Sequence, residues 1–195
     1  MLDENQFEFI KHKYGHYASW AVWADEGAKP KDNMGDLSVF DLRTNPDLLR
    51  ILNPFIVLVG LNISGRIERQ LGNFHSRKPH ANDYKIRFAL KNTPFYGAYM
   101  TEIIKDFEQK ISGKVMTYLR GDKTFEAENV EIFREEISDL GVEQPRIIAF
   151  GNDAYKILSN NLSGEYDIGK IPHYSHFISK ENYKKEIGTI LINSG

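Results

Sequence analysis

The sequence predicts an α/β fold in which helices cover both faces of a central, mostly parallel sheet, a three-layer α/β/α sandwich. Residues 54–59 and 145–150 are short apolar runs rich in β-branched and aromatic residues, typical of strands buried on both faces. Residues 128–140 instead place apolar residues at helical spacing. Because strands and helices alternate along the chain, crossover connections are expected, and they make neighbouring strands parallel.

The first part of the chain, residues 1–44, is expected to pack on the core as an N-terminal extension. Phe7, Ile10 and Tyr14 are spaced for one face of a helix, which Gly15 should end. Residues 19–23 are apolar and aromatic and are expected in the core, whereas residues 25–36 contain glycine and proline and predict a loop.

A helix start, a strand and a long loop are predicted next. Residues 44–47 combine a capping residue with proline at the first helical position, and Leu48, Leu49 and Leu52 follow as an apolar side. The strand over 54–59 comes directly afterwards. We expect a brief helix over 66–71 and then a loop over 72–83, a segment with few apolar residues.

The second half of the chain continues the alternation. A strand over 96–104 precedes the helix over 128–140, and a further strand covers 145–150. Asn152 or Asp153 is expected to cap the next helix. The apolar positions of that helix and of a closing helix are Ala154, Ile157, Leu158, Leu162, Tyr183, Ile187, Ile190 and Leu191. The sequence has no internal repeat, so we expect a single α/β domain over residues 1–195 with a motif-bearing core over 54–178.

Composition limits the class of protein. The 195 residues are 41% hydrophobic and 27% charged, which is ordinary for a globular chain. No apolar run approaches the ~18 residues that a membrane-spanning helix needs. The acidic start, residues 1–5, lacks the basic and then apolar order of a signal peptide, and there are no cysteines. These features predict a cytoplasmic protein without membrane contact or disulfides.

The polar turn after the first core strand is the first place to look for chemistry. It reads Gly60-Leu61-Asn62-Ile63-Ser64-Gly65, and open α/β sheets bind ligands outside the carboxyl ends of their strands. The two glycines have the spacing of a phosphate-binding P-loop, but the next residues are Arg66 and Ile67 where that loop needs lysine and a hydroxyl. The chain also lacks the three-glycine dinucleotide fingerprint and the Gly-x-Ser-x-Gly elbow.

Basic residues gather directly after this turn. Residues 66–91 hold seven Lys or Arg side chains against two acidic ones, a local excess in a chain whose formal net charge is −2. Such an excess beside a site suits contacts with phosphates. The alternative is a solvated segment of mixed charge.

Two strand-end turns resemble motifs of the uracil-DNA glycosylase superfamily. The turn over 60–65 stands where that family has Gly-x-Asn/Asp-Pro-Gly, and Pro172-His173-Tyr174-Ser175-His176 stands where it has a His-Pro-Ser motif. Phe74, in Gly72-Asn73-Phe74-His75, looks like the aromatic residue that stacks on the extruded base, and residues 149–154 are similar to the segment before the histidine motif. The resemblance spans roughly residues 55–177 and implies a uracil-DNA glycosylase-like fold.

The resemblance also implies an activity. A monofunctional DNA glycosylase would hydrolyse the N-glycosidic bond of uracil or another deaminated base in single- or double-stranded DNA, with no metal, organic cofactor or obligate protein partner. Asn62 and His173 would be catalytic, the first orienting the attacking water and the second donating to the base. Residues implied to contact the base are Gly60, Leu61 and Phe74. Residues implied to contact phosphates are Ser64, Gly65, Arg66, Arg77, Lys78 and Ser175.

Both motifs depart from the family pattern. Ile63 stands where the first motif has proline, with one extra residue before the glycine, and Tyr174 stands where the second has proline. Proline fixes φ and removes an N–H donor, so the two turns can hold their side chains differently. A non-catalytic module that binds nucleic acid or a nucleotide on the same scaffold is therefore the main alternative.

Other interpretations of single residues stay open. Asn62 can serve a tight turn, Phe74 can belong to the core, and His173 can be a packed or solvated histidine. A small-molecule hydrolase would pair His173 with a carboxylate such as Asp153 or Glu102. The roles left open are a metal pair at His12 and His16 or at His173 and His176, and a site or surface role for Glu102 and Asp106.

Overall fold

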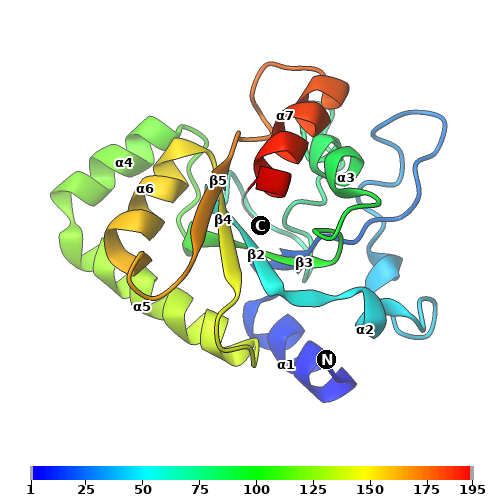
Figure 1. Cartoon of the computed structure of the whole chain (residues 1–195), viewed down its shortest axis with the longest axis horizontal. Helices are drawn as coiled ribbons and strands as arrows, with labels where there is room; N and C mark the ends of the chain where they lie inside the picture. The colour runs from blue at the N-terminus through cyan, green and yellow to red at the C-terminus, as the bar shows by residue number, and fades with distance from the viewer. Residues whose placement is uncertain (1, 194–195) are drawn as a thin grey trace.

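The computed structural model describes residues 2–193 and shows an α/β fold around one five-stranded sheet (Figure 1). The strand order is β1-β3-β2-β4-β5, in which β1 pairs with β3 antiparallel and all other neighbours are parallel. The prediction of a mostly parallel sheet is thus confirmed. The strands are β1 (Ser19–Trp20), β2 (Asn53–Asn62), β3 (Ala98–Ile104), β4 (Arg146–Phe150) and β5 (Ile168–Ile171).

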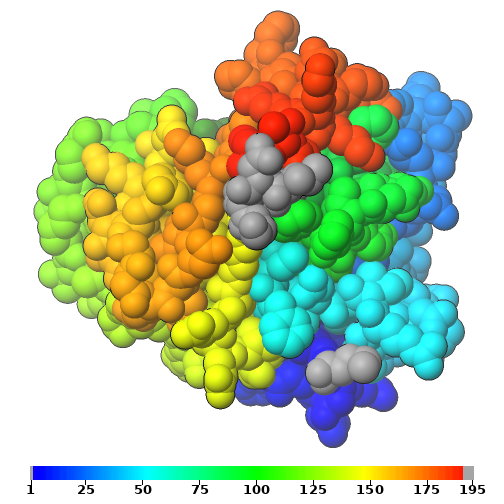
Figure 2. Space-filling view, in the orientation of Figure 1, coloured from blue at the N-terminus to red at the C-terminus, as the bar shows by residue number. Residues whose placement is uncertain are grey.

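Helices lie on both sides of this sheet. They are α1 (Glu4–Tyr14), α2 (Leu48–Ile51), α3 (Tyr84–Leu90), α4 (Ser112–Gly121), α5 (Lys123–Asp139), α6 (Gly151–Leu162) and α7 (Lys180–Asn193), with a 3₁₀ turn, η1 (Leu37–Phe40). In Figure 1, α4, α5 and α6 lie to one side of the sheet and α3 and α7 to the other. The space-filling view shows α7 seated against the α3 segment (Figure 2). None of the helices described is long and apolar enough to cross a membrane.

The alternation of side chains along β2 divides the interior into two cores. Val57, Val59 and Leu61 belong to the core beneath α1, α5 and α6, whereas Leu58 belongs to the core beneath α3 and α7. All four side chains are buried. A strand apolar on both faces is what a sheet covered by helices on each side requires, and this explains the unbroken apolar run.

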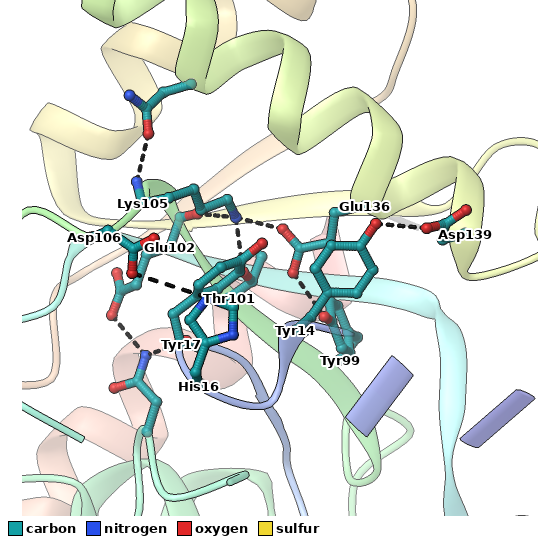
Figure 3. A network of polar contacts seen from close by, with 12 residues as sticks. Tyr14, His16, Tyr17, Tyr99, Thr101, Glu102, Lys105, Asp106, Glu136 and Asp139 are labelled. Atoms are coloured by element: carbon teal, nitrogen blue, oxygen red, sulfur yellow. Dashed lines mark hydrogen bonds and ion pairs between the residues drawn. The ribbon is translucent and has the colours of Figure 1, made fainter. Parts of the chain in front are cut away.

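Buried residues of the N-terminal segment belong to the first of these cores. Asp3 caps α1 by accepting a hydrogen bond from the Gln6 N–H (2.8 Å), and Gly15 is its C-cap. The predicted stripe of Phe7, Ile10 and Tyr14 is buried. The Tyr14 hydroxyl also donates to the Asp139 carboxylate at the end of α5 (2.5 Å; Figure 3).

Several predicted elements are confirmed with shifted ends. The strand predicted over 96–104 begins at Ala98, the helix predicted over 128–140 begins earlier, at Lys123, and the helix start at Pro46 leads to a single turn, α2. The apolar positions predicted for α6 are buried, as are Tyr183 and Ile187 of α7. The side chain of Leu191 lies outside the described part.

Other predictions are wrong. Residues 66–71 form no helix: residues 66–68 are irregular, and a bend and turn follow over 69–71, where the Leu71 N–H donates to the carbonyl of Gly15 (2.7 Å). The N-cap of α6 is Phe150 and no side chain caps it, so neither Asn152 nor Asp153 has that role. Helices α3 and α4, the 3₁₀ turn η1 and the two-residue strand β1 were not predicted, and no range was predicted for β5.

A buried ion pair attaches β3 to α5 (Figure 3). The Lys105 ammonium contacts the Glu136 carboxylate and donates to the Thr101 hydroxyl (3.0 Å), and both charged side chains are buried. The Tyr99 hydroxyl donates to the other oxygen of Glu136 (2.6 Å). Burial lowers the pKa of Lys105, and Glu136 opposes that shift. Buried charges need such complete pairing, so this network holds the two elements in one register.

Candidate functional site

The two motif turns lie at the same edge of the sheet. Strands β2, β4 and β5 run parallel, so their carboxyl ends point the same way, with β4 between the other two (Figure 1). Asn62 is the last residue of β2, and His173 follows the end of β5 at Ile171. The strand therefore continues two residues beyond Gly60, and the polar turn begins only at Ile63.

Asn62 connects the turn after β2 to the loop after β3. Its side-chain NH₂ lies 2.8 Å from the carbonyls of Ile63 and Phe107 and 2.9 Å from that of Gln109. Its donors are thus fully occupied by main chain. Within residues 2–193, nothing donates a hydrogen bond to the Asn62 Oδ1, which leaves this oxygen as the acceptor that a water molecule can use.

His173 has a defined tautomer. The backbone N–H of Ser175 donates to Nδ1 (3.1 Å), and the Ser175 hydroxyl lies 2.7 Å from the same nitrogen. A backbone N–H only donates, so Nδ1 accepts and the neutral ring carries its proton on Nε2. Burial lowers the pKa of His173 to about 4, so the ring is neutral at pH 7. No described residue bonds Nε2, which remains free as a neutral N–H donor.

Phe74 and His173 share one aromatic cluster with Phe150 and Tyr174. The Phe74 ring lies 6.0 Å from Phe150 and 6.3 Å from Tyr174, and the His173 ring stacks on Tyr174 at 4.3 Å. Only 3% of Phe74 is exposed, so its ring packs in the core beneath α3 and α7 and is not an open platform. Asn62 is not a member of this cluster.

The backbone of Phe74 is held in the left-handed region, with φ of 62°. The Asn73 side chain accepts from the Phe74 N–H (3.1 Å), and the indole N–H of Trp23 donates to the Phe74 carbonyl (3.2 Å). Asn73 in turn donates to the Tyr17 carbonyl (2.7 Å) and to the Glu102 carboxylate (3.0 Å). The loop over 72–83 is therefore fixed at this point by Tyr17 and Trp23, which flank β1, and by Glu102 of β3.

Glu102 places a buried carboxyl group beside the first motif. Its Oε2 lies only 2.0 Å from where a Cβ on Gly60 would be, so Gly60 is needed at this position for its lack of a side chain. Burial raises the pKa of Glu102 to about 7, against the lowering effect of the Asn73 hydrogen bond and Lys105. Burial likewise raises the pKa of Asp83, which precedes α3, to about 6. In the sequence, Glu102 is marked only as the one acidic residue of a largely apolar strand.

Two of the basic residues between 66 and 91 are not available to a ligand. Lys85 and Arg87 are buried on α3. Lys85 donates to the His176 carbonyl (2.9 Å), and Arg87 donates to carbonyls of the loop before η1. The expectation of a basic patch from the whole segment is therefore wrong for these two side chains, which hold loops together.

The three basic residues predicted to contact phosphates have charged groups without an ion-pair partner in the described chain. Arg66, Arg77 and Lys78 are exposed, and none of them forms an ion pair within the described chain. The Lys78 ammonium lies 4.0 Å from the Cβ position of Gly65, so Lys78 and the turn at Ser64 and Gly65 face one another. This places a free ammonium beside the first motif.

The hydrolase interpretation requires a hydrogen bond between His173 and a carboxylate, and the described residues form none. Ser175 occupies Nδ1, and neither Asp153 nor Glu102 bonds the ring within the described residues. No group of three His, Asp or Glu side chains between residues 2 and 193 is placed to hold a metal ion. His16 instead lies 3.9 Å from the exposed Asp106.

Two hollows lie away from the aromatic cluster. An open one of about 270 Å³ is lined by α1, η1 and residues 70–71, and one of about 30 Å³ lies beside Trp23 and Arg87. Asn62, Phe74 and His173 line neither of them. No protein-family model, curated protein or solved structure matches the chain.

Proposed function

We propose that this protein is a DNA glycosylase of the uracil-DNA glycosylase-like type, which hydrolyses the N-glycosidic bond of uracil or another deaminated base. The observation that carries the proposal is the neutral His173 ring, whose Nδ1 is occupied by Ser175 and whose Nε2–H has no partner in the described chain. A donor of this kind at a strand end suits a developing anion.

The donor acts on the departing base. In hydrolysis the bond between C1′ of the sugar and the base nitrogen breaks, the electron pair leaves with the base, and water oxygen bonds to C1′ while its proton goes to solvent or the base. Negative charge then gathers on a base carbonyl oxygen. The Nε2–H of His173 stabilises it without first losing a proton, and one such donor is worth roughly 3 to 4 kcal/mol in comparable sites.

Asn62 orients the attacking water through its free Oδ1. Its NH₂ group is tied to three carbonyls, so the amide has a fixed direction. An amide oxygen does not take up a proton as a carboxylate does, and its help as a base is weak. This chemistry favours bases that leave readily, such as uracil and other deaminated bases.

The remaining residues serve binding. The backbone of Gly60 and Leu61, together with the aromatic cluster to which Phe74 belongs, is proposed to bound the base, which must leave the stack before reaction. The side chains of Phe74 and Leu61 are buried in the two cores on opposite faces of the sheet. Ser64, Gly65, Arg66, Arg77, Lys78 and Ser175 are proposed to contact phosphates on either side. Exposed cations without ion pairs suit this role, because phosphate contacts carry most of the salt-dependent affinity for DNA.

The experiment is base release from oligonucleotides that contain uracil, hypoxanthine or xanthine, in single and double strands, read as alkali-labile strand breaks. We expect release by the unaltered protein and a loss of about 100-fold or more with His173→Ala. His12→Ala on α1 is the matched control and should leave the rate unchanged. An absence of release from every substrate rejects the enzymatic proposal.

A non-catalytic module for nucleic acid is the second candidate. It is favoured by the burial of Phe74 and by the engagement of the Asn62 amide with main chain, both of which suit a structural role. This module would bind DNA with a steep salt dependence and release no base. The same oligonucleotides, followed by fluorescence anisotropy at several salt concentrations, separate the two candidates.

A further inference from the structure

Glu102 lies outside both motifs but is joined to Phe74 by a continuous chain of hydrogen bonds. Its Oε1 accepts from the Asn73 NH₂ (3.0 Å), and the Asn73 Oδ1 accepts from the Phe74 N–H (3.1 Å). The Phe74 carbonyl accepts from the Trp23 indole (3.2 Å). A change at the Glu102 carboxyl group is thus transmitted to Phe74 through one side chain.

Asn73 has no spare hydrogen-bonding capacity for its NH₂ group. One hydrogen goes to the Tyr17 carbonyl (2.7 Å) and the other to Glu102. The left-handed backbone of Phe74 is unfavourable for a residue with a side chain, so it persists only while neighbouring contacts hold it. Removal of the Glu102 carboxyl group would leave one Asn73 hydrogen without an acceptor. The Asn73 side chain, which holds the Phe74 N–H, would then be less firmly fixed.

We propose that Glu102 is a positioning residue of the site, which holds Asn73 and through it fixes the backbone of Phe74, whose buried ring packs against Phe150 and Tyr174 beside His173. This inference rests on the proposed function for the role of the site, but the hydrogen-bond chain itself is independent of it. A carboxylate accepts a stronger hydrogen bond than a carboxylic acid, so the hold on Asn73 tightens when Glu102 ionises.

The surroundings of Glu102 place this change near neutral pH. Burial raises the pKa of Glu102 to about 7, while the Asn73 hydrogen bond and the positive charge of Lys105 act in the opposite direction. Asp83 before α3 and Glu136 on α5 raise that pKa further through their negative charges. Glu102 also acts on the Tyr174 hydroxyl, and burial raises the pKa of Tyr174, so this group is neutral at pH 7.

The test uses the Trp23 indole, because its N–H reports the position of the Phe74 carbonyl without any substrate. In ¹⁵N NMR spectra of the full chain, two indole signals are expected from Trp20 and Trp23, and Trp23→Phe assigns them. We expect the Trp23 signal to shift between pH 5 and 9 with a midpoint near 7. Glu102→Gln should keep the signal near its wild-type position and remove the titration.

Variants that break the hydrogen-bond chain should move the Trp23 signal at every pH. Glu102→Ala and Asn73→Ala are expected to have the same effect, and the double variant no more than either alone, because both remove one linkage. The exposed Glu128→Gln on α5 is the matched control and should leave the signal and its titration unchanged. If Glu102→Ala does not fold, the Glu102→Gln and Asn73→Ala comparison still decides.

Base release gives the second readout. Glu102→Ala should raise KM about 10-fold, because the aromatic cluster beside His173 is no longer held in place, and leave kcat within about 3-fold, and Glu102→Gln should restore KM. A Trp23 signal in Glu102→Ala and Asn73→Ala that matches the wild type overturns the positioning role. An absence of base release by the wild type, with the NMR results as expected, rejects only the proposed function.

Discussion

The Ser175 N–H lies 3.1 Å from Nδ1 of His173, and this single hydrogen bond determines which ring nitrogen carries the proton. It also makes the candidate donor independent of any carboxylate, since a main-chain group orients the ring. The closeness of the two residues in sequence means that one short turn builds the whole arrangement.

The tautomer of His173 is the first prediction. Because burial lowers the pKa of His173 to about 4, we expect the ring to stay neutral, with its proton on Nε2, from pH 8 down to about pH 5. Two-bond ¹⁵N–¹H NMR correlations distinguish the tautomers directly. Ser175→Ala keeps the backbone donor and should keep the tautomer, whereas a proton on Nδ1 in the wild type would contradict the assigned role.

The second prediction concerns stability and pH. The folded-state pKa of Glu102, about 7, lies above its ordinary value of 4.5, so the free energy of unfolding should fall as pH rises from about 4.5 to 7. The fall is on the order of 3 kcal/mol at most. The lowered pKa of His173 acts oppositely, since stability is lost as pH falls from about 6.5 to 4.

Urea denaturation at a series of pH values measures this dependence. Glu102→Gln should remove this contribution, so the free energy of unfolding of the wild type relative to Glu102→Gln should fall between pH 4.5 and 7. The opposing contribution of His173 and the contribution of Asp83, whose pKa burial also raises, are common to both proteins. The same decline in Glu102→Gln as in the wild type would show that another group is responsible.

Gly60→Ala is the third prediction. The new methyl group would meet the Glu102 Oε2 at 2.0 Å inside a buried strand, so we expect a loss of about 1 to 3 kcal/mol in the free energy of unfolding. Gly60→Ala combined with Glu102→Ala should recover part of the loss. Gly113→Ala on α4, where nothing lies within 4 Å, is the matched control and should stabilise by up to about 1 kcal/mol.

The fourth prediction separates the free cations from the buried ones. If Lys78 and Arg66 each contact one phosphate, as proposed, Lys78→Ala and Arg66→Ala should each weaken DNA binding and lower the slope of log K against log salt by about 1. Lys123→Ala on α5, where the side chain pairs with Glu126, is the control. An unchanged slope in both variants would exclude the turn after β2 from the DNA interface.

The central strands of the sheet could be predicted because their sequences have a recognisable apolar pattern. The run 54–59 and the run 145–150 are apolar on both faces, and only a covered sheet accommodates that pattern. Helix α3 was hidden because Lys85 and Arg87 stand among its buried positions, which conceals its apolar side. Their burial depends on carbonyls from distant loops, and local sequence carries no sign of those partners.

The motif residues could likewise be predicted, but not their surroundings. Asn62 ends β2 and His173 follows the end of β5, and apolar runs that stop at polar residues are recognisable in a sequence. That Phe74 is buried, that Ser175 holds His173 and that Glu102 reaches Asn73 all follow from tertiary packing. Polar residues such as Glu102 inside apolar strands are the one signal that could have directed attention there.

The segment before β2 builds part of the site without contributing a motif to it. The carbonyl of Gly15 accepts the Leu71 N–H (2.7 Å), that of Tyr17 accepts from Asn73 (2.7 Å), and that of Val22 lies 2.9 Å from the His75 ring. A truncated polypeptide starting at Asn53 would keep both motifs but lack the backbone carbonyls that bond residues 71–75. Expression of this fragment alone would therefore give a protein in which the Phe74 side of the aromatic cluster is not formed.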